Sequence, residues 1–287
     1  MNHIRIQSLK DISDDTLYNA HREAFADYPF SWSREAFDRM LKRRGYSAEL
    51  SFGAFDNEQL VSFNYNCTGM YYGKSSAYDT STGTIATHRN RGLAAQVFEH
   101  SIPYLKAAGI EQYLLDVLTD NATAVALYKR QGFEITRQFD CFKTDVAGWE
   151  AGQTGANNEI VLRPIEVSEH TLSNDMGDIR LSWQNHFNAL LQKPEDFIMI
   201  GAYAADEWVG YGIIEPETGD IPMLAVRTDM RRRGIGSSLF NALAKQNKAA
   251  ILRIVNIETT QEDVLGFMKS QRLPKIVSLF EMIKIIK

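Results

Sequence analysis

The sequence RNRGLA at residues 89–94 returns as RRRGIG at residues 231–236, 142 positions further along a chain of 287 residues. Each copy follows a short apolar run, at residues 84–87 and at residues 223–226, and each opens an amphipathic segment with helical periodicity. The spacing is close to half of the chain length. The repeat therefore predicts a duplicated domain.

A strand, a basic turn with glycine and a helix together present free backbone N–H groups to an anion. Gly92 lets the backbone approach a phosphate closely, and Ala94 is small enough for nearly the same approach. The second copy has glycine at both positions, Gly234 and Gly236. For either copy alone, an ordinary strand–helix turn with surface arginines is an equal alternative, but two copies in equivalent contexts weigh against it.

The composition excludes several classes of protein. A hydrophobic fraction of 44% is enough for packed cores, and a net charge of −5 argues against a general binder of nucleic acid or of anionic membranes. The sequence contains no apolar run of about 18 residues and no visible signal peptide, so we expect no membrane span. The two cysteines form no metal-ligand pattern, which predicts a reducing, cytoplasmic compartment and no metal site.

The predicted elements follow a similar order in the two halves of the chain. In the first half we expect strands at 4–6, 50–55, 59–66, 76–87, 112–118 and 133–144, and helices at 15–25, 33–43, 93–108 and 122–131. In the second half we expect strands at 160–164, 197–203, 208–214, 221–226, 251–255 and 276–286, and helices at 179–191, 237–246 and 262–270. This order predicts an α/β fold twice, with domains at 1–147 and 160–287 and a linker at 148–159.

One motif suggests a different kind of site, a nucleotide-binding loop. Residues 69–75, GMYYGKS, resemble a nucleotide-binding P-loop but are one residue short of its pattern, and the segment that follows is typical of a strand and not of a helix. We therefore interpret them as a hairpin turn.

A third sequence pattern, which follows the first copy of the repeat, helps to interpret it. Residues 121–133 read NATAVALYKRQGF and directly follow a predicted strand. A strand, an R-x-x-G-x-[AG] turn, a helix, a second strand and then N-x-x-A-x-x-x-Y-x-x-x-G-F resemble the GNAT superfamily of N-acetyltransferases. The resemblance is closest over residues 80–135 and continues through the first half by element order, and the second half looks like the same fold. The chain thus resembles a tandem GNAT protein, in which each domain has a mixed, partly splayed β-sheet flanked by helices.

This resemblance implies an acetyl-CoA-dependent enzyme that transfers an acetyl group to a primary amine without a metal. It implies that a strand pairs with the pantetheine arm, that the turn holds the pyrophosphate, and that Asn121 lies between the splayed fourth and fifth strands. The cofactor residues implied in the first domain are Ile85, Ala86, Thr87, Asn90, Arg91, Gly92, Leu93, Ala94, Ala95 and Asn121. Those in the second domain are Leu224, Ala225, Val226, Arg232, Arg233, Gly234, Ile235, Gly236 and Ser237.

The same resemblance places Tyr128 near the sulfur of CoA. A tyrosine with a pKa of about 10 is able to protonate a departing thiolate, so Tyr128 is the expected acid. We expect a backbone N–H group near Ile85 to stabilise the oxyanion. A helix tyrosine that is simply packed by its ring is the alternative.

The sequence leaves the general base open. Asp79 and Asp116 flank the expected site, but each is interpreted as a solvated or capping carboxylate. His88 is interpreted as an exposed residue at a strand end, because a base should lie near the acetyl group and not near the phosphates. Many enzymes of this superfamily deprotonate the amine through water.

The second half departs from the pattern at the tyrosine. Matching Leu273 with Phe133 sets Met268 against Tyr128, and a methionine has no proton to donate. We expect this half either to bind CoA without catalysis or to shape the acceptor pocket. Catalysis in the C-terminal half and a non-catalytic module that binds acyl-CoA or a partner stay open as alternatives. The acceptor is a small-molecule or peptide amine, and the sequence does not specify the oligomeric state.

Overall fold

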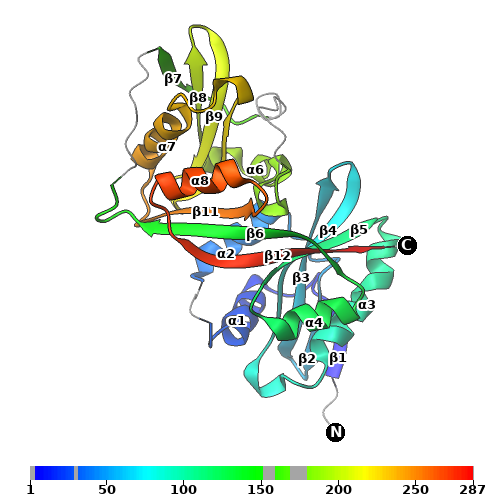
Figure 1. Cartoon of the computed structure of the whole chain (residues 1–287). Helices are drawn as coiled ribbons and strands as arrows, with labels where there is room; N and C mark the ends of the chain where they lie inside the picture. The colour runs from blue at the N-terminus through cyan, green and yellow to red at the C-terminus, as the bar shows by residue number, and fades with distance from the viewer. Residues whose placement is uncertain (1–3, 29–31, 151–158, 169–179, 287) are drawn as a thin grey trace. The chain divides into compact units, whose positions relative to one another are not determined.

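The computed structural model describes residues 4–28, 32–150, 159–168 and 180–286. The chain divides into two compact units. Unit 1 consists of Met1–Thr136 and Phe280–Lys287, and unit 2 consists of Arg137–Leu279. Both units have the predicted α/β architecture, a β-sheet with helices packed against it (Figure 1).

Unit 1 follows the expected order of elements closely. Its strands are β1 (Ile4–Ser8), β2 (Phe52–Asp56), β3 (Gln59–Tyr71), β4 (Lys74–Thr84) and β5 (Gln112–Leu118). Its helices are α1 (Asp14–Ala24), α2 (Arg34–Arg44), α3 (Leu93–Ala107) and α4 (Ala122–Arg130), with the 3-10 turn η1 (Ala86–His88) before α3. β6 (Glu134–Asp145) begins in unit 1 and continues into unit 2.

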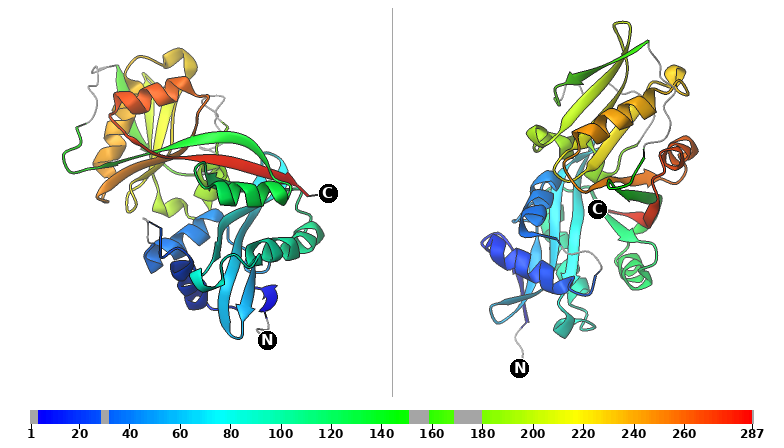
Figure 2. Two further views of the ribbon diagram at one scale, coloured as in Figure 1. Left: turned by 60° about the horizontal axis from the view of Figure 1, so that its bottom comes forward. Right: turned by 90° about the vertical axis from the view of Figure 1, so that its left-hand side faces the viewer.

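The strands of unit 1 lie in the order β1-β2-β3-β4-β5-β12. β1 to β4 pair antiparallel, whereas β4 and β5 run parallel. Tyr72 and Gly73 both have positive φ values between β3 and β4, which confirms the hairpin turn over the P-loop interpretation. α1 and α2 pack on the face that carries Phe63 and Tyr65, and α3 and α4 pack on the face that carries Tyr113 (Figure 2).

Unit 2 has a similar arrangement of strands and helices. Its strands are β7 (Ile160–Ile165), β8 (Ile198–Ala204), β9 (Glu207–Glu215), β10 (Asp220–Val226) and β11 (Ile251–Glu258), and they lie in the order β6-β11-β10-β9-β8-β7. Its helices are α6 (Phe187–Leu191), α7 (Ile235–Gln246) and α8 (Glu262–Ser270), with the 3-10 turns η2 (Trp183–Asn185), η3 (Pro194–Asp196) and η4 (Thr228–Met230). β12 (Lys275–Ile285) begins in unit 2 and ends in unit 1.

The helices differ in whether a side chain caps their N-terminus. Ser13, Ser33 and Asn121 cap α1, α2 and α4, because the side chain of each accepts a hydrogen bond from the first turn. α3 and α7 instead begin after Gly92 and Gly234, which have no side chain to offer. The first-turn N–H groups of these two helices therefore face outward without a side-chain cap.

Each unit contains a strand from the other half of the sequence. The β6 residues Arg137–Asp145 belong to unit 2, where β6 pairs antiparallel with β11 and Phe142 joins the core. The β12 residues from Phe280 onward belong to unit 1, where Met282 and Ile286 join the core and the Ile286 N–H donates to the Glu111 carbonyl. The units thus exchange their last strands.

Several predicted elements are wrong in extent. β3 continues to Tyr71 and not only to residue 66, and β11 continues to Glu258 and not only to residue 255. The helix expected at 179–191 is, among its described residues, a 3-10 turn followed by the short helix α6. His186 separates the two because it adopts an extended conformation and caps α6 through its ring. The strand expected at 76–87 ends at Thr84, because the chain enters the 3-10 turn η1 at Ala86.

Candidate functional site

The two basic turns have the same backbone conformation. Asn90 and Arg232 lie 142 residues apart and have φ values of 62° and 63°, while Gly92 and Gly234 have φ values of 73° and 79°. This left-handed region favours glycine, and asparagine tolerates it better than most residues. The repeat in the sequence is therefore a repeat in geometry.

The first arginine of each turn braces the turn. Nε of Arg89 donates to the Thr84 carbonyl at 3.2 Å, and Nε of Arg231 donates to the Val226 carbonyl at 3.1 Å. Arg89 also donates to Asp27 at 2.8 Å, and Arg231 donates to Asp263 at 3.0 Å. These side chains hold the strand end against the turn, and the residues that follow them face solvent.

The turns have the form of anion cradles. Asn90, Arg91 and Gly92 are exposed, and the α3 N-terminus behind them has no side-chain cap. A Cβ built at Gly92 meets only the Gln96 side chain, at 3.7 Å. The space in front of the helix is open, which suits a phosphate group at the positive end of the helix dipole.

The strand beside each cradle ends its pairing with the neighbouring strand in the same way. The Ile85 N–H donates to the Val61 carbonyl at 3.0 Å, and the equivalent Arg227 N–H donates to Val209. Within the region around Ile85, the N–H of Ile85 itself is therefore already bonded to β3. Because strand residues alternate in direction, the Thr82 and Thr84 backbone groups turn away from β3. The 142-residue spacing matches residues 82–84 with Leu224, Ala225 and Val226, so the two strands present equivalent residues beside the two cradles.

β4 and β5 separate beside this edge. Their pairs run from Ser76↔Gln112 to Asp79↔Leu115, and β4 continues to Thr84 without a further recorded pair to β5 among the described residues. In unit 2, β10 and β11 share the single recorded pair Asp220↔Arg253. The predicted partial splay is present in both sheets.

A cavity of about 280 Å³ opens in unit 1 where β4 and β5 separate. The cavity is bounded by the second half of β4, the end of β5, the helices α1 and α2, and the start of α4. Tyr128, Asp79 and Asn121 line it, so the structure brings the predicted acid and the predicted cofactor asparagine together. Asn121 also caps α4 and donates from its amide to the Tyr28 hydroxyl at 3.4 Å.

Asp79 is buried beside Tyr128, so its interpretation as a solvated or capping carboxylate is wrong. It is 5% exposed, and its Oδ2 accepts from the Tyr128 hydroxyl at 3.1 Å and from the Thr82 hydroxyl at 2.7 Å. Burial raises the pKa of Asp79 from 3.8 to about 6, against the opposing effect of these hydrogen bonds. Burial, followed by the charge of Asp79, raises the pKa of Tyr128 well above 10.

The other two candidate bases lie in different surroundings. Asp116 lines the same cavity and accepts from the Tyr78 hydroxyl at 2.9 Å. His88 is 9% exposed, and its Nε2 lies 3.1 Å from Asp56. The expectation of an exposed His88 is wrong, because the 3-10 turn folds this side chain back against β2.

The wall of the cavity on the side of α1 and α2 is aromatic. Phe25, Tyr28 and Trp32 line it, and Arg44 donates to Thr80 at 2.8 Å beside them. His21 also lines the cavity, and burial lowers the pKa of His21 to about 4. The imidazole is therefore neutral at physiological pH.

Unit 2 has a cavity of about 540 Å³ at its own cradle. The lining includes the predicted residues Leu224, Ala225, Val226, Arg232, Gly234, Ile235, Gly236 and Ser237. Ile221 and Met268 also line it, at the positions that correspond to Asp79 and Tyr128 in the sequence. Arg272 and Gly132, matched in the sequence, both have positive φ, which supports this alignment of α8 with α4. Unit 2 therefore has the cradle without the polar pair.

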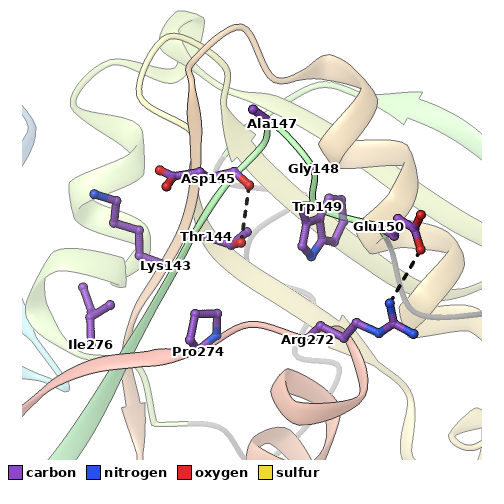
Figure 3. A pocket seen from close by; sticks show the side chains of 10 residues that line it. All are labelled: Lys143, Thr144, Asp145, Ala147, Gly148, Trp149, Glu150, Arg272, Pro274 and Ile276. Carbon is purple, nitrogen blue, oxygen red and sulfur yellow. Dashed lines mark hydrogen bonds and ion pairs between the residues drawn. The ribbon is translucent and has the colours of Figure 1, made fainter.

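A further cavity of about 590 Å³ lies in unit 2 where β6 ends and β12 begins (Figure 3). Lys143, Trp149 and Arg272 line it, and the Trp149 ring N–H donates to the Gln271 carbonyl at 3.0 Å. None of the predicted site residues lies there. No group of three or more His, Cys, Asp or Glu side chains within the described ranges is placed to hold a metal ion. No described helix is long and apolar enough to cross a membrane.

Comparisons with known proteins agree with this geometry. The model of the Acetyltransferase (GNAT) family matches residues 17–133, and that of the Acetyltransferase (GNAT) domain matches residues 181–267. Together the two ranges cover more than two thirds of the chain. No curated protein sequence matches the chain significantly.

Solved structures with similar folds extend over the whole chain. A tandem GNAT protein from the clavulanic acid biosynthesis pathway is 10% identical with a TM-score of 0.75, and the match covers 99% of both chains. A GCN5-related N-acetyltransferase from Sphaerobacter thermophilus is 11% identical with a TM-score of 0.74, over 99% of this chain and 96% of that one. A putative acetyltransferase from Pyrococcus horikoshii is 15% identical with a TM-score of 0.69, over 100% and 91%. At these identities the likeness concerns the fold alone.

Proposed function

Since the chain belongs to the GNAT family of acetyltransferases, with two domains of that family in tandem, we propose that unit 1 transfers the acetyl group of acetyl-CoA to a primary amine. The observation that carries this proposal is the position of Tyr128 in the cavity where β4 and β5 separate.

The proposal assigns the co-substrate to the cradle and the adjoining strand edge. The backbone N–H groups from Asn90 to Ala95 hold the pyrophosphate in front of α3. The pantetheine arm pairs with the open edge of β4 at Thr82 and Thr84, in place of the residues 85–87 expected from the sequence. The support for this change is the recorded hydrogen bond of the Ile85 N–H to Val61, which turns Thr84 toward the open edge.

The chemistry then divides between a backbone group and a side chain. The neutral amine attacks the thioester carbonyl, and the Thr82 N–H at the open edge stabilises the oxyanion. Tyr128 protonates the departing sulfur. The cavity on the side of α1 and α2 receives the acceptor, and its volume of about 280 Å³ suits a small-molecule amine or the end of a peptide.

We assign a different role to unit 2. Its cradle repeats that of unit 1, but Ile221 and Met268 offer no group for proton transfer. Unit 2 therefore binds a CoA thioester in the cavity of about 540 Å³ without turning it over. The buried free thiols of Cys67 and Cys141 are compatible with a reducing, cytoplasmic location.

The test is a screen of primary amines against acetyl-CoA that follows the release of free thiol. We expect turnover with at least one amine, and a loss of about 100-fold or more in kcat for Tyr128→Phe. CoA binding to that variant, measured by calorimetry, should be unchanged. Tyr104→Phe is the matched control, because Tyr104 is exposed on α3.

Other outcomes select the alternatives. Tight CoA binding without thiol release from any amine would favour a non-catalytic binding module. Full activity of Tyr128→Phe would remove Tyr128 as the acid.

A further inference from the structure

The unit 1 cavity has one positively charged side chain among its described lining residues. Arg44, the last residue of α2, lines the cavity, and its Nη1 donates to the Thr80 hydroxyl at 2.8 Å. His21 also lines the cavity but is neutral at physiological pH, because burial lowers its pKa to about 4. A guanidinium group has five N–H donors, so Arg44 can bind a carboxylate while it keeps its bond to Thr80.

A bulge in β4 helps to orient this arginine. The pairing of β4 with β3 shifts by one position at Thr80, which is therefore the extra residue of the bulge. The Thr80 hydroxyl is directed at α2, where it lies 3.2 Å from the Met40 sulfur and accepts from Arg44. The bulge thus fixes the guanidinium beside the point where β4 and β5 separate.

The wall of the cavity on the side of α1 and α2 suits a planar ring. Phe25, Tyr28 and Trp32 line it. Phe25 packs on the neutral His21 ring with the ring centroids 4.7 Å apart, and it meets Tyr28 edge-on at 5.1 Å. Tyr28 is 40% exposed, so part of its ring is open to a ligand. A ring of the ligand would extend this aromatic cluster by one member.

The charges of the lining favour an acceptor that carries both signs. Asp79 and Asp116 are acidic and Arg44 is basic among the described lining residues. A polyamine would bring several positive charges against Arg44, and the amine of a protein side chain or N-terminus has no carboxylate beside it. A free amino acid has one amine and one carboxylate. The cavity volume of about 280 Å³ is small for a ligand site, which fits a single small molecule.

We propose that the acceptor of unit 1 is a free α-amino acid with an aromatic side chain. Arg44 binds its carboxylate, and the aromatic wall holds its ring. This inference rests on the proposed acetyl transfer and names its substrate class. The α-amino nitrogen enters neutral, forms a bond to the acetyl carbon and gives up one proton. The carbon–sulfur bond breaks and the sulfur gains one proton, so the products are an N-acetylamino acid and free CoA.

The cavity of unit 2 differs in these features. The position 142 residues after Thr80 is Pro222, which has no hydroxyl to hold an arginine, although the pairing of β10 with β9 also shifts between Asp220 and Met223. The described lining of the unit 2 cavity begins at Ile221 and includes no residue of the helices before β10. Both units therefore have the cradle, whereas in the described parts of the chain only the unit 1 cavity has the features that an amino acid requires.

The first test compares phenylalanine with three amines that each lack one of its groups. Phenylalanine amide has no carboxylate charge, phenethylamine has no carboxyl group, and alanine has no ring. The measurement is thiol release at saturating acetyl-CoA. We expect kcat/KM for phenylalanine to exceed that for the amide and for phenethylamine by about 100-fold, and that for alanine by about 10-fold. A preferred acceptor without a carboxylate beside its amine, or equal values for alanine and phenylalanine, would overturn the proposal while leaving the acetyltransferase in place.

The second test removes the guanidinium group. Arg44→Met should raise the KM for phenylalanine by about 100-fold and leave the KM values for phenylalanine amide and acetyl-CoA unchanged. Arg44→Lys should restore part of the affinity, because it keeps the charge without the planar fork. Lys42→Met is the matched control and should behave as the wild type, because Lys42 is an exposed cation of the same helix that does not line the cavity. Equal losses for phenylalanine and its amide in Arg44→Met would show that Arg44 does not recognise the carboxylate.

The third test needs no turnover. Calorimetry with protein saturated with CoA measures phenylalanine binding when no acetyl group is present to transfer. We expect binding to be about 100-fold weaker in Arg44→Met and about 10-fold weaker in Tyr28→Ala. Tyr104→Ala, which changes an exposed tyrosine on α3, should bind as the wild type does. Unchanged affinity in Arg44→Met and Tyr28→Ala would overturn the proposed site, whereas phenylalanine binding without thiol release from any amine would refute the transfer and leave the site in place.

Discussion

The Tyr128 hydroxyl lies 3.1 Å from Oδ2 of Asp79, across the gap between β4 and α4, with both side chains buried. Burial raises the pKa of the Asp79 carboxyl from its ordinary value of 3.8 to about 6. The folded protein therefore binds this proton more tightly than the unfolded chain does. The associated stabilisation is present below pH 3.8 and is lost as the pH rises through 6. At pH 7 the ionised carboxylate therefore lowers the free energy of unfolding by about 3 kcal/mol.

Asp79→Asn should stabilise the protein at neutral pH. The amide keeps the shape of the side chain and removes the buried charge, so we expect the free energy of unfolding at pH 7 to rise by up to about 3 kcal/mol. The gain should disappear below about pH 4. Urea unfolding at several pH values measures it, and equal stability of variant and wild type at pH 7 would contradict the buried charge.

The contribution of His21 to the free energy of unfolding should have the opposite pH dependence. Burial lowers its pKa from 6.5 to about 4, so the unfolded chain binds this proton more tightly. The contribution of His21 to stability is present above pH 6.5 and is lost as the pH falls toward 4. His21→Phe, which keeps a ring among Phe25, Phe37 and Phe63, should remove this acid loss of about 3 kcal/mol.

The two contributions oppose each other between pH 4 and 6, so each single variant should show a slope that the wild type conceals. Asp79→Asn should become more sensitive to acid than the wild type, and His21→Phe should become less sensitive. Parallel pH profiles for all three proteins would show that neither group titrates as its burial implies.

Much of this fold could be predicted because its signals are local. Periodicity placed α3, β5 and α4 within a residue or two, and the basic turn fixed the start of α3 and, within two residues, that of α7. The end of β4 was missed because a 3-10 turn keeps the apolar Ile85 buried, as a strand would.

The site was harder to predict because it depends on distant contacts. Asp79 acquires its chemistry from Tyr128, 49 positions away, and from burial between two helices and a sheet. The sequence did carry a trace of this, since the 142-residue spacing sets Ile221 against Asp79. The strand exchange has no local signal, because β6 and β12 show the same alternation whichever sheet they join.

The two cradles should respond separately to a negative charge. Gly92→Glu and Gly234→Glu each place a carboxylate where a phosphate is expected, at positions with φ values of 73° and 79° that also disfavour a side chain. We expect Gly92→Glu to abolish turnover and Gly234→Glu to leave turnover and remove one of two calorimetric CoA sites. Gly236→Ala is the control, because its Cβ would meet Phe267 at an ordinary 3.5 Å. Loss of turnover only in Gly234→Glu would place catalysis in unit 2.

Each unit should depend for its stability on the strand that it receives from the other half of the sequence. Met282 is fully buried in the unit 1 core, although it lies in the second half of the sequence, and Phe142 is buried in the unit 2 core, although it lies in the first. Replacing either with alanine removes buried side-chain volume and should cost about 2–5 kcal/mol in the unit that receives the strand.

Hydrogen exchange followed by mass spectrometry resolves the two units. Met282→Ala should speed exchange in β5, α3 and α4, and Phe142→Ala should speed it in β11 and α7. Ile285→Ala is the matched control for β12, because Ile285 is 51% exposed and should change neither unit. If Met282→Ala instead loosened β11 and left β5 protected, β12 would belong with the half of the sequence that encodes it, and the exchange of strands would be disproved.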